Sequence, residues 1–559
     1  MRYPILVLLL FVWMPLFGQE IISTQNATSF YLRTFLEPTD PSQKPLVQGQ
    51  MLFSSVVVHR FYTERDFQVA WMREDTVLLE LAYEMRYEIQ QSKFDGLQPS
   101  DYHLQAIEGL FTRYEAARSE GKSLSTADLA ALDLLLSDAF VMLASHLYHG
   151  KVDPEQLRTV WNIQRSAPDL YLDQRLISAL EGGSIRRALQ ELYPSFTIYR
   201  PMREGLRQLY EDFERFQIEQ PSSWKEIKTS KSIKVGDNSA IISEVVKRLS
   251  FWGFLPNDYE SQGKGYDAEI EEAVKKLQLK FGMEPDGVIG QGTIYALNQS
   301  PENLIKKASI NLERLRWLPD NLKEQELIIV NTANFQLDFI QQRDTVLSSR
   351  VIVGRSFHST PQFSAQMSYL VFSPTWTVPP SILRQEVIPG MRKDPQYMAK
   401  KKMRLLTFSG QEVPINSVDW SKVSAAGFPY MVRQDPGEHN SLGLVKFMFP
   451  NKHHVYIHDT PARSLFERED RALSYGCIRI QKPVELAKLL LQHDERWTDE
   501  RIHTAMRQSK EQVVNLDRKI PVVILYLTYW TNSNGRMFFR RDIYNRDNEV
   551  YQALIQKRS

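Results

Sequence analysis

The spacing of apolar residues divides the chain into a helical first part and a strand-rich last part. Residues from about 25 to 225 carry apolar positions at helical spacing; one such helix starts at Ser125 or Thr126 and stops at Gly150. From Leu327 the pattern changes to short apolar or alternating runs such as "ELIIVNTANFQLDFIQQ" and "PVVILYLTYW", which predict strands. We therefore expect a multidomain α+β chain, with a helical scaffold before a β-rich domain that contains a curled sheet.

A compact helical unit at residues 232–300 separates these two parts. Ile242 and Leu249 share one face of a predicted helix, a second helix repeats the spacing, and an Asp286-Gly287 turn precedes a short third helix. The ordered residues of "YD…AVKKLQ…FG…DGVIG…TIYALN" resemble the three-helix peptidoglycan-binding domain found beside many cell-wall enzymes. A generic helical hairpin is the alternative that the helices alone leave open.

The strand-rich part is interrupted by a polar and mixed segment, residues 381–430, which we interpret as an insertion that acts as a lid. The predicted organisation is a signal peptide at 1–18, a helical scaffold at 19–231, the three-helix unit at 232–300, the β-rich domain at 301–545 and a C-terminal tail at 546–559.

The first residues predict export. Arg2 precedes an apolar run from Ile5 to Met14, and the small residue Gly18 follows, which is the layout of a secretory signal. We expect the mature chain in the periplasm or cell envelope; an uncleaved signal that tethers it to the membrane is the alternative. The net charge of +1 over 559 residues argues against a nucleic-acid partner, whose binding needs clustered basic charge.

Cys477 is the only cysteine of the chain, so it cannot form an internal disulfide. One interpretation is a buried, inert cysteine that serves as a small apolar residue. The other is a nucleophile, which requires a base because the thiolate is the attacking species. His458 ends the apolar run "VYIH" nineteen residues upstream and suits proton transfer near neutral pH. The pair predicts a cysteine nucleophile with a histidine base.

The residues around Cys477 fit this chemistry. Gly476 lets the backbone approach a substrate carbonyl, so its N–H and that of Cys477 are candidate donors to an oxyanion. Arg479 either clamps a substrate carboxylate or forms a structural ion pair. Ser474 either orients His458 and the loop or is a turn residue.

The stretch "HDT" followed by "SYGCIR" resembles the signature of the L,D-transpeptidase catalytic domain. The stretches "SPTWTVPPSI", "RQDPGEHNSLGLVKFMFPN" and "FFRRDIY" resemble the large, multidomain branch of that family. Many members have a histidine directly before the Gly-Cys pair, whereas this chain has Tyr475. This departure leaves His458 as the sole base candidate within the motif.

The resemblance implies a cysteine acyltransferase that acts on peptidoglycan. Cys477 would attack the bond between the diamino acid and the terminal D-alanine of a tetrapeptide stem, and another stem amine would resolve the acyl-enzyme as a 3→3 cross-link. The carbonyl or carboxylate of Asp459 would orient His458. The implied partners are peptidoglycan stem peptides and glycan, bound by a monomer without metal or organic cofactor.

Weaker substrate-binding candidates are Trp376, either a cleft wall or a core residue, with Tyr456 and Asn440. Three other functions stay open at this point. They are an L,D-carboxypeptidase that uses water as acceptor, a cell-wall cysteine peptidase, and a non-catalytic peptidoglycan-binding protein. Cysteine peptidases of that kind usually place the cysteine before the histidine, and the intact residue set argues against a non-catalytic protein.

Overall fold

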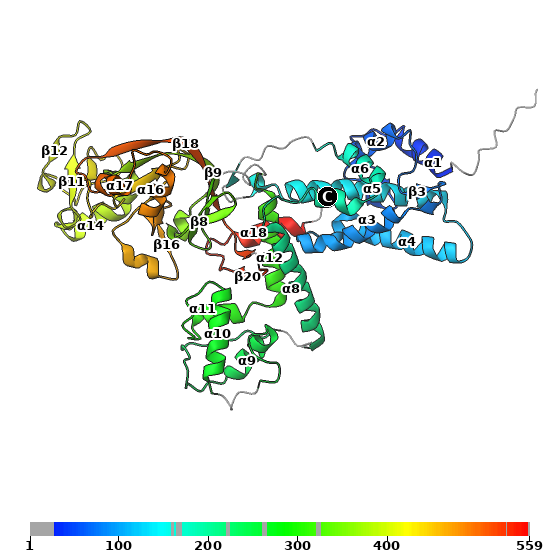
Figure 1. The fold of residues 1–559 in the computed structure, drawn as a ribbon, viewed down its shortest axis with the longest axis horizontal. Helices are drawn as coiled ribbons and strands as arrows, with labels where there is room; N and C mark the ends of the chain where they lie inside the picture. Colours follow the sequence, from blue (N-terminus) through cyan, green and yellow to red (C-terminus); the bar gives the residue numbers. More distant parts are fainter. Residues whose placement is uncertain are drawn as a thin grey trace, which may run out of the picture. The chain divides into compact units, whose positions relative to one another are not determined.

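A computed structural model of the chain describes residues 27–157, 161–163, 170–219, 224–259, 265–319, 326–532 and 534–556. The signal peptide predicted at residues 1–18 lies outside the described residues. No helix within the described ranges is long and apolar enough to cross a bilayer. Contacts divide the chain into two units (Figure 1). The second unit holds Ser92–Gln98, Ser145–Asp169 and everything from Leu192 onward.

The first unit is helical, as predicted. Its elements are α1 (Ala27–Leu36), α2 (Ser55–Glu64), α3 (Glu80–Gln91), α4 (Leu104–Ser119), most of α5 (Thr126–His149), α6 (Leu172–Glu181) and α7 (Ile185–Gln190), with hairpins β1–β2 (Leu46–Val47, Gln50–Met51) and β3–β4 (Met72–Arg73, Val77–Leu78). Helix α5 is fastened by buried polar groups: the carboxylate of Asp133 accepts hydrogen bonds from the backbone N–H groups of Ala70 and Trp71. Burial raises the pKa of Asp133 to about 6.

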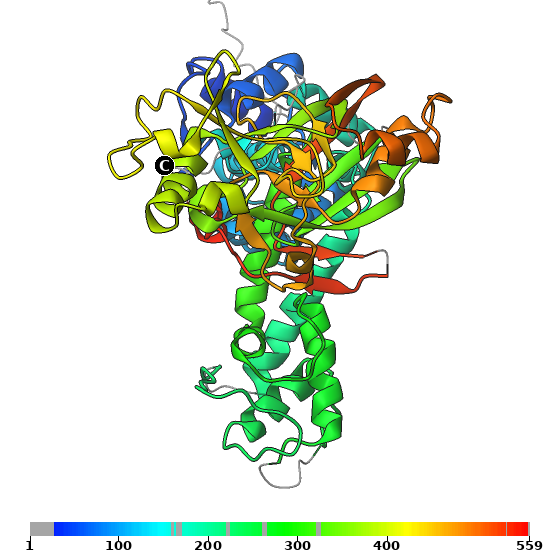
Figure 2. The ribbon, with the colours of Figure 1, turned by 90° about the vertical axis from the view of Figure 1, so that its left-hand side faces the viewer.

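The second unit begins with helices that carry the three-helix module. Helix α8 (Tyr199–Glu219) and helix α12 (Pro301–Arg316) lie side by side, and the module is attached between them in the sequence (Figures 1 and 2). The module consists of α9 (Ile242–Phe251), α10 (Ala268–Lys280) and α11 (Gln291–Leu297). Its apolar face is buried as the spacing predicted, since Ile242 and Leu249 have no exposed surface.

The residues that carried the resemblance of this module hold its turn together. The amide of Gln278 donates to Asp286 Oδ1 at 2.8 Å and to Thr293 Oγ1 at 3.2 Å, and its carbonyl accepts from the Gly287 N–H at 2.9 Å. Because Gln278 is buried, losing these bonds would leave unsatisfied polar groups inside the module. Their spacing in the sequence therefore reflects the packing of the turn against α10.

A closed sheet forms the core of the C-terminal part. The strand order is β14-β15-β17-β8-β7-β6-β18-β9, and β9 also pairs with β14, which closes the sheet on itself. The strands are β6 (Leu327–Asn331), β7 (Gln336–Gln341), β8 (Asp344–Gly354), β9 (Gln362–Phe372), β14 (Val445–Met448), β15 (Ile457–His458), β17 (Ile478–Ile480) and β18 (Gln512–Leu525). The predicted β-rich domain with a curled sheet is thereby confirmed.

Shorter elements complete this part. The interior of the sheet packs with α16 (Pro483–Leu491) and α17 (Asp499–Ala505) into one apolar cluster. Strand β16 (Ala472–Ser474) pairs with β8, and β19 (Tyr529–Thr531) forms a hairpin with β20 (Met537–Phe539). Strand β5 (Trp161–Asn162), which precedes the module in the sequence, adds to β9 in parallel.

The insertion is a subdomain with a sheet of its own, in the order β10-β13-β11-β12. These strands are β10 (Trp376–Thr377), β11 (Met403–Leu406), β12 (Glu412–Val413) and β13 (Met431–Gln434), and the helical segments α13 (Pro380–Ile382), η7 (Leu383–Val387), α14 (Ile388–Lys393) and α15 (Tyr397–Lys400) cover them. A separate apolar cluster fills its interior. We call residues 376–434 the inserted subdomain (yellow in Figure 2); it is wider than the 381–430 expected from composition.

Within the segment expected as a C-terminal tail, residues Asp547–Ile555 form helix α18. Asp547 at its start accepts hydrogen bonds from Lys307 Nζ at 3.0 Å and Arg314 NH1 at 2.7 Å, both on α12. These two cations lower the pKa of Asp547 to about 2, although burial acts in the opposite direction. Helix α18 is thus anchored to α12 by buried ionic contacts.

Candidate active site

Two neighbouring parallel strands bring the predicted nucleophile and base to the same face of the sheet. Strands β15 and β17 pair with His458 opposite Arg479 and Ile457 opposite Ile478. Extending this register by one residue sets Tyr456 opposite Cys477. Because side chains alternate between the two faces of a strand, Tyr456, His458, Cys477 and Arg479 all lie on one face.

His458 is held in one orientation by the backbone of the next residue. Its Nδ1 donates to the carbonyl oxygen of Asp459 at 2.5 Å, so Nε2 is the nitrogen available to accept a proton. The side chain is only 5% exposed. Burial and the nearby charge of Arg479 lower the pKa of His458 to about 3, against the opposing effect of the Asp459 and Leu442 carbonyls. The imidazole is therefore neutral at neutral pH.

The carboxylate of Asp459 is engaged elsewhere. It accepts hydrogen bonds from the Leu444 N–H at 2.8 Å, from the Thr460 N–H at 2.7 Å and from the guanidinium of Arg463 at 2.5 Å. Gly443 permits this close approach, since a Cβ on it would lie 2.3 Å from Asp459 Oδ2, and its φ of +62° also favours glycine. Of the two ways in which Asp459 was expected to contact the base, the carbonyl is the one observed.

Cys477 rests as a thiol. Burial raises its pKa, and this effect outweighs the stabilisation of the thiolate by Tyr456 and by the charge of Arg479. The sulfur lies 3.8 Å from the carbonyl oxygen of His454. Cys477 and His458 are therefore both neutral at rest, and the thiol proton has not been transferred to the imidazole.

The loop before Cys477 is shaped by Ser474. Its hydroxyl donates to the Cys477 carbonyl at 2.6 Å and accepts from the Gly476 N–H at 3.1 Å. Gly476 has a φ of +112°, and its carbonyl accepts from Thr360 Oγ1 at 2.9 Å. The Gly476 N–H, expected as an oxyanion donor, is thus already used within the loop. Within the described part of the chain, the Cys477 N–H has no acceptor.

Among the residues that the structure describes, Arg479 has no carboxylate within salt-bridge distance, although the charge of Glu386 acts on its guanidinium. Its Nε is buried and finds no hydrogen-bond acceptor there. A buried donor without an acceptor is costly, and a ligand that accepts the bond relieves this cost. The guanidinium also influences the pKa values of His458 and Cys477, so its charge acts directly on the thiol and imidazole.

Tyr475 joins the loop to the inserted subdomain. Its hydroxyl donates to Glu386 Oε1 at 2.8 Å, and the guanidinium of Arg355 lies 5.3 Å from its ring centre. Beside it, His358 Nε2 lies 3.3 Å from Gln385 Oε1. Sequence reasoning missed Glu386, which is 89 residues from Tyr475, because no spacing rule relates an insertion to the loop it contacts.

The three weaker candidates differ in position. Trp376 is 9% exposed and belongs to the apolar cluster of the inserted subdomain. Asn440 is fully buried, and its amide donates to the carbonyl oxygens of Pro374 and Asp435. Tyr456 alone reaches the thiol, and burial together with Cys477 raises its pKa.

Three segments of the chain match known domain families. Residues 57–206 match the family described as "Scaffold domain". Residues 238–297 match "Putative peptidoglycan binding domain", and residues 325–524 match "L,D-transpeptidase catalytic domain". The last match contains both His458 and Cys477.

The chain is also similar to individual proteins. It is 35% identical over 253 residues to a Haemophilus influenzae protein named "Putative L,D-transpeptidase". The matched region is 45% of this chain and 50% of that relative, so the match spans half the relative's length. Solved L,D-transpeptidase structures from Stackebrandtia nassauensis and Xylanimonas cellulosilytica each match 54% of this chain. The match covers 97% of the first structure's chain and 100% of the second's. Their identities are 13% and 11%, with TM-scores of 0.20 and 0.16.

Proposed function

Because the chain carries an L,D-transpeptidase catalytic domain beside a peptidoglycan-binding domain, we propose that it is a cysteine acyltransferase of cell-wall peptidoglycan. It acts outside the cytoplasm on a tetrapeptide stem. It breaks the bond between the L-centre of the diamino acid and the terminal D-alanine, and it transfers the acyl group to the side-chain amine of a second stem. The product is a 3→3 cross-link.

The observation that carries this proposal is the position of Cys477 and His458 on adjacent parallel strands, with both side chains on one face. The hydrogen bond from His458 Nδ1 to the Asp459 carbonyl selects the tautomer in which Nε2 accepts a proton. A thiol, a base with fixed tautomer and a cation on the same face form a set suited to acyl transfer.

In the first half-reaction, His458 Nε2 accepts the thiol proton as Cys477 Sγ bonds to the scissile carbonyl carbon. The Cys477 N–H donates to the oxygen that becomes negative, a contribution of about 10²–10³ in rate for one such donor. The imidazolium then protonates the departing D-alanine nitrogen. The C–N bond breaks and a thioester remains on Cys477.

Arg479 binds a substrate carboxylate in this scheme, through the guanidinium whose Nε is buried without an acceptor. This contact also activates the base. The charge of Arg479 lowers the pKa of His458, and a bound carboxylate offsets that repulsion and raises the pKa toward the value a general base needs. Substrate binding and proton transfer are thereby linked.

In the second half-reaction, the amine of another stem attacks the thioester, His458 takes its proton and returns it to the departing sulfur of Cys477. The inserted subdomain serves as a lid that shields the thioester from water. Its attachment at Tyr475 and Glu386 supports this role, since that contact lies two residues from the nucleophile.

The test is incubation of the protein with soluble disaccharide tetrapeptide, followed by mass spectrometry of the products. We expect cross-linked dimers and free D-alanine from the parent protein and neither from Cys477→Ala. Free D-alanine without dimers would indicate a carboxypeptidase. Cleavage inside the stem would indicate an endopeptidase, and no product from either protein would indicate a non-catalytic binding protein.

A further inference from the structure

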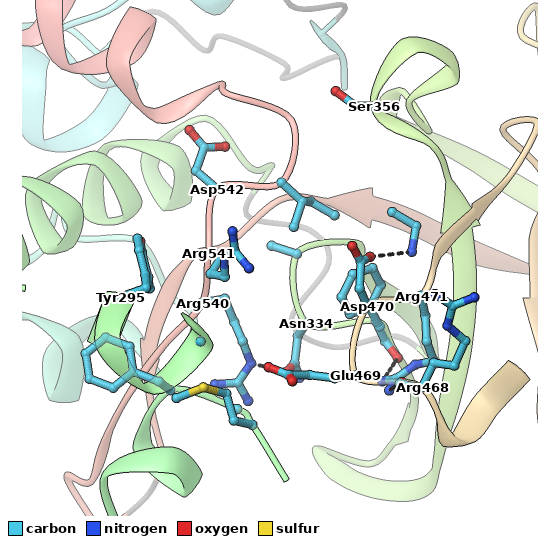
Figure 3. A pocket seen from close by; sticks show the side chains of 18 of the residues that line it. Tyr295, Asn334, Ser356, Arg468, Glu469, Asp470, Arg471, Arg540, Arg541 and Asp542 are labelled. Atoms are coloured by element: carbon cyan, nitrogen blue, oxygen red, sulfur yellow. Dashed lines mark hydrogen bonds between the residues drawn. The ribbon is translucent and has the colours of Figure 1, made fainter. Parts of the chain in front are cut away.

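A cavity lies between the three-helix module and the closed sheet (Figure 3). Its volume is about 830 Å³, which is within the usual range for small-molecule sites. The module contributes Phe281, Met283 and Tyr295 to its lining, while the other walls come from residues 468–472 and 540–543. Neither Cys477 nor His458 lines it, so it is separate from the catalytic face.

Cationic side chains dominate this cavity. Arginines outnumber carboxylates in its lining, and the four arginines labelled in Figure 3 come from two separate segments. The arginines are Arg355, Arg468, Arg471, Arg540 and Arg541, and the carboxylates are Glu469, Asp470 and Asp542.

The two most enclosed guanidiniums, Arg471 and Arg540, bond only to neutral acceptors among the described residues. Arg471 donates to the carbonyl oxygens of Phe335, Val351 and Arg468, and Arg540 donates to Asn334 Oδ1 at 2.7 Å and to the Phe539 carbonyl. Burial lowers the pKa of each to about 10, and the charge of Arg471 contributes to the lowering at Arg540. Both remain charged at neutral pH, so this wall carries positive charge that no bonded carboxylate balances.

The rim of the cavity carries charges of both signs, since the exposed Arg468 and Arg541 lie there with two exposed carboxylates. Glu469 and Asp470 are exposed there, and burial raises the pKa of Glu469, against the charge of Arg541 and with the added effect of Asp286, Asp470 and Glu284. This arrangement places two carboxylates at the rim next to a basic wall. It suits a ligand with a carboxylate at one end and an amine at the other.

We propose that this cavity binds the peptide stem of a second peptidoglycan strand, which does not react at Cys477. The stem carboxylate lies against Arg471 and Arg540, and the side-chain amine of its diamino acid faces Glu469 and Asp470. Tyr295 and Phe281 of the module contact its apolar atoms. The inference rests on the proposed function only for the identity of the ligand.

The cavity is connected to the catalytic loop through the chain itself. Residues 468–472 continue through β16 to Cys477, and Arg355, which lines the cavity, donates to the Leu473 carbonyl at 3.2 Å. The same guanidinium lies over the ring of Tyr475. A stem held here keeps a neighbouring strand beside the reacting one, which raises its effective concentration at the catalytic face.

Titration calorimetry of Cys477→Ala with soluble disaccharide tetrapeptide tests this proposal. We expect two binding sites. One of them should weaken about tenfold or more in Arg471→Gln/Arg540→Gln, because hydrogen bonds to charged groups are lost. It should weaken similarly when the stem's carboxyl groups are amidated. The control is Arg496→Gln, an exposed arginine outside the cavity, which should retain both sites.

A second pair, Glu469→Gln/Asp470→Asn, changes only the exposed carboxylates that face the stem amine, and it tests the proposal if the first pair fails to fold. A single site in Cys477→Ala, or an unweakened second site in a folded variant, overturns the inference. Acylation of the parent protein at Cys477, read by intact mass, reports on the proposed function separately. Acylation without a second site overturns only the inference, and a second site without acylation overturns only the proposed function.

Discussion

The hydroxyl of Tyr475 donates a 2.8 Å hydrogen bond to Glu386, which ties the catalytic loop to the inserted subdomain. Tyr475→Phe removes this bond and leaves the carboxylate without its partner, at a cost of about 1–3 kcal/mol. We expect faster alkylation of Cys477 by a small reagent and slower acyl transfer, because the lid opens more often. Lys422→Ala, at an exposed site of the same subdomain, is the control. Equal losses of labelling and transfer would instead indicate misfolding.

The resting state of the thiol predicts a pH profile. Burial raises the pKa of Cys477 above its usual value, so the thiolate fraction is small at neutral pH and increases with pH. The rate constant for alkylation by iodoacetamide should therefore rise about tenfold per pH unit from pH 6 to 9. A plateau near neutral pH would contradict this and indicate a thiolate–imidazolium pair.

His458→Gln should slow acylation by the tetrapeptide about 10²–10⁴-fold, the usual contribution of a general base. His454→Gln is the matched control. His454 contacts the sulfur through its backbone carbonyl, and glutamine keeps that carbonyl. Stopped-flow or quenched-flow mass measurement of the acyl-enzyme gives both rates. Comparable losses of acylation rate in the two variants would show that His458 is not the base.

Arg479→Gln should reduce kcat/KM for acylation about 10–100-fold, since it removes a charged hydrogen bond to the substrate. The loss should disappear with a donor whose stem carboxylates are amidated, because that donor never made the contact. Arg479→Lys should restore part of the activity. If the amidated donor showed the same loss, Arg479 would act on the fold and not on the substrate.

Asp547→Asn should lower the free energy of unfolding of the second unit by about 3–5 kcal/mol, because it leaves Lys307 and Arg314 buried without a carboxylate. The folded pKa of about 2 lies below the unfolded value of about 4. The stabilisation is therefore present above about pH 4 and is lost as pH falls toward 2. Thermal unfolding at pH 7 and pH 3 measures this, with exposed Asp499→Asn as control. A constant difference between the two pH values would contradict the assignment.

The sequence predicted His458 and Cys477 because both occur in one continuous motif, on strands whose apolar alternation is visible in the chain. The neighbours that shape them were not predictable in this way. Thr360 reaches the site by a hydrogen bond to the Gly476 carbonyl, Gly443 by close packing against Asp459, and Glu386 from the inserted subdomain. Gly476 was expected to donate its N–H to an oxyanion, but the hydrogen bond of this N–H to Ser474 depends on the turn geometry, which the sequence does not specify.

The helices and strands could be predicted from the periodicity of apolar residues, whereas the contacts between distant segments could not. The pairing of β9 with β14 that closes the sheet depends on a register between strands about 80 residues apart. Helix α18 buries Val550 and Leu554, and the ionic contacts of Asp547 with α12, more than 200 residues away in the sequence, anchor its start. Local patterns contain no information about such long-range partners.

The catalytic sheet includes β5, so it is not formed by one continuous segment of the chain. Asn162 pairs with Phe363, while Phe363 also pairs with Ile524 on its other side. A truncated chain that starts at residue 301 would lack β5 and leave the outer main chain of Gln362 and Phe363 as a free edge. Free edges recruit strands from other molecules, so such a truncation is expected to aggregate where one that starts near residue 150 does not.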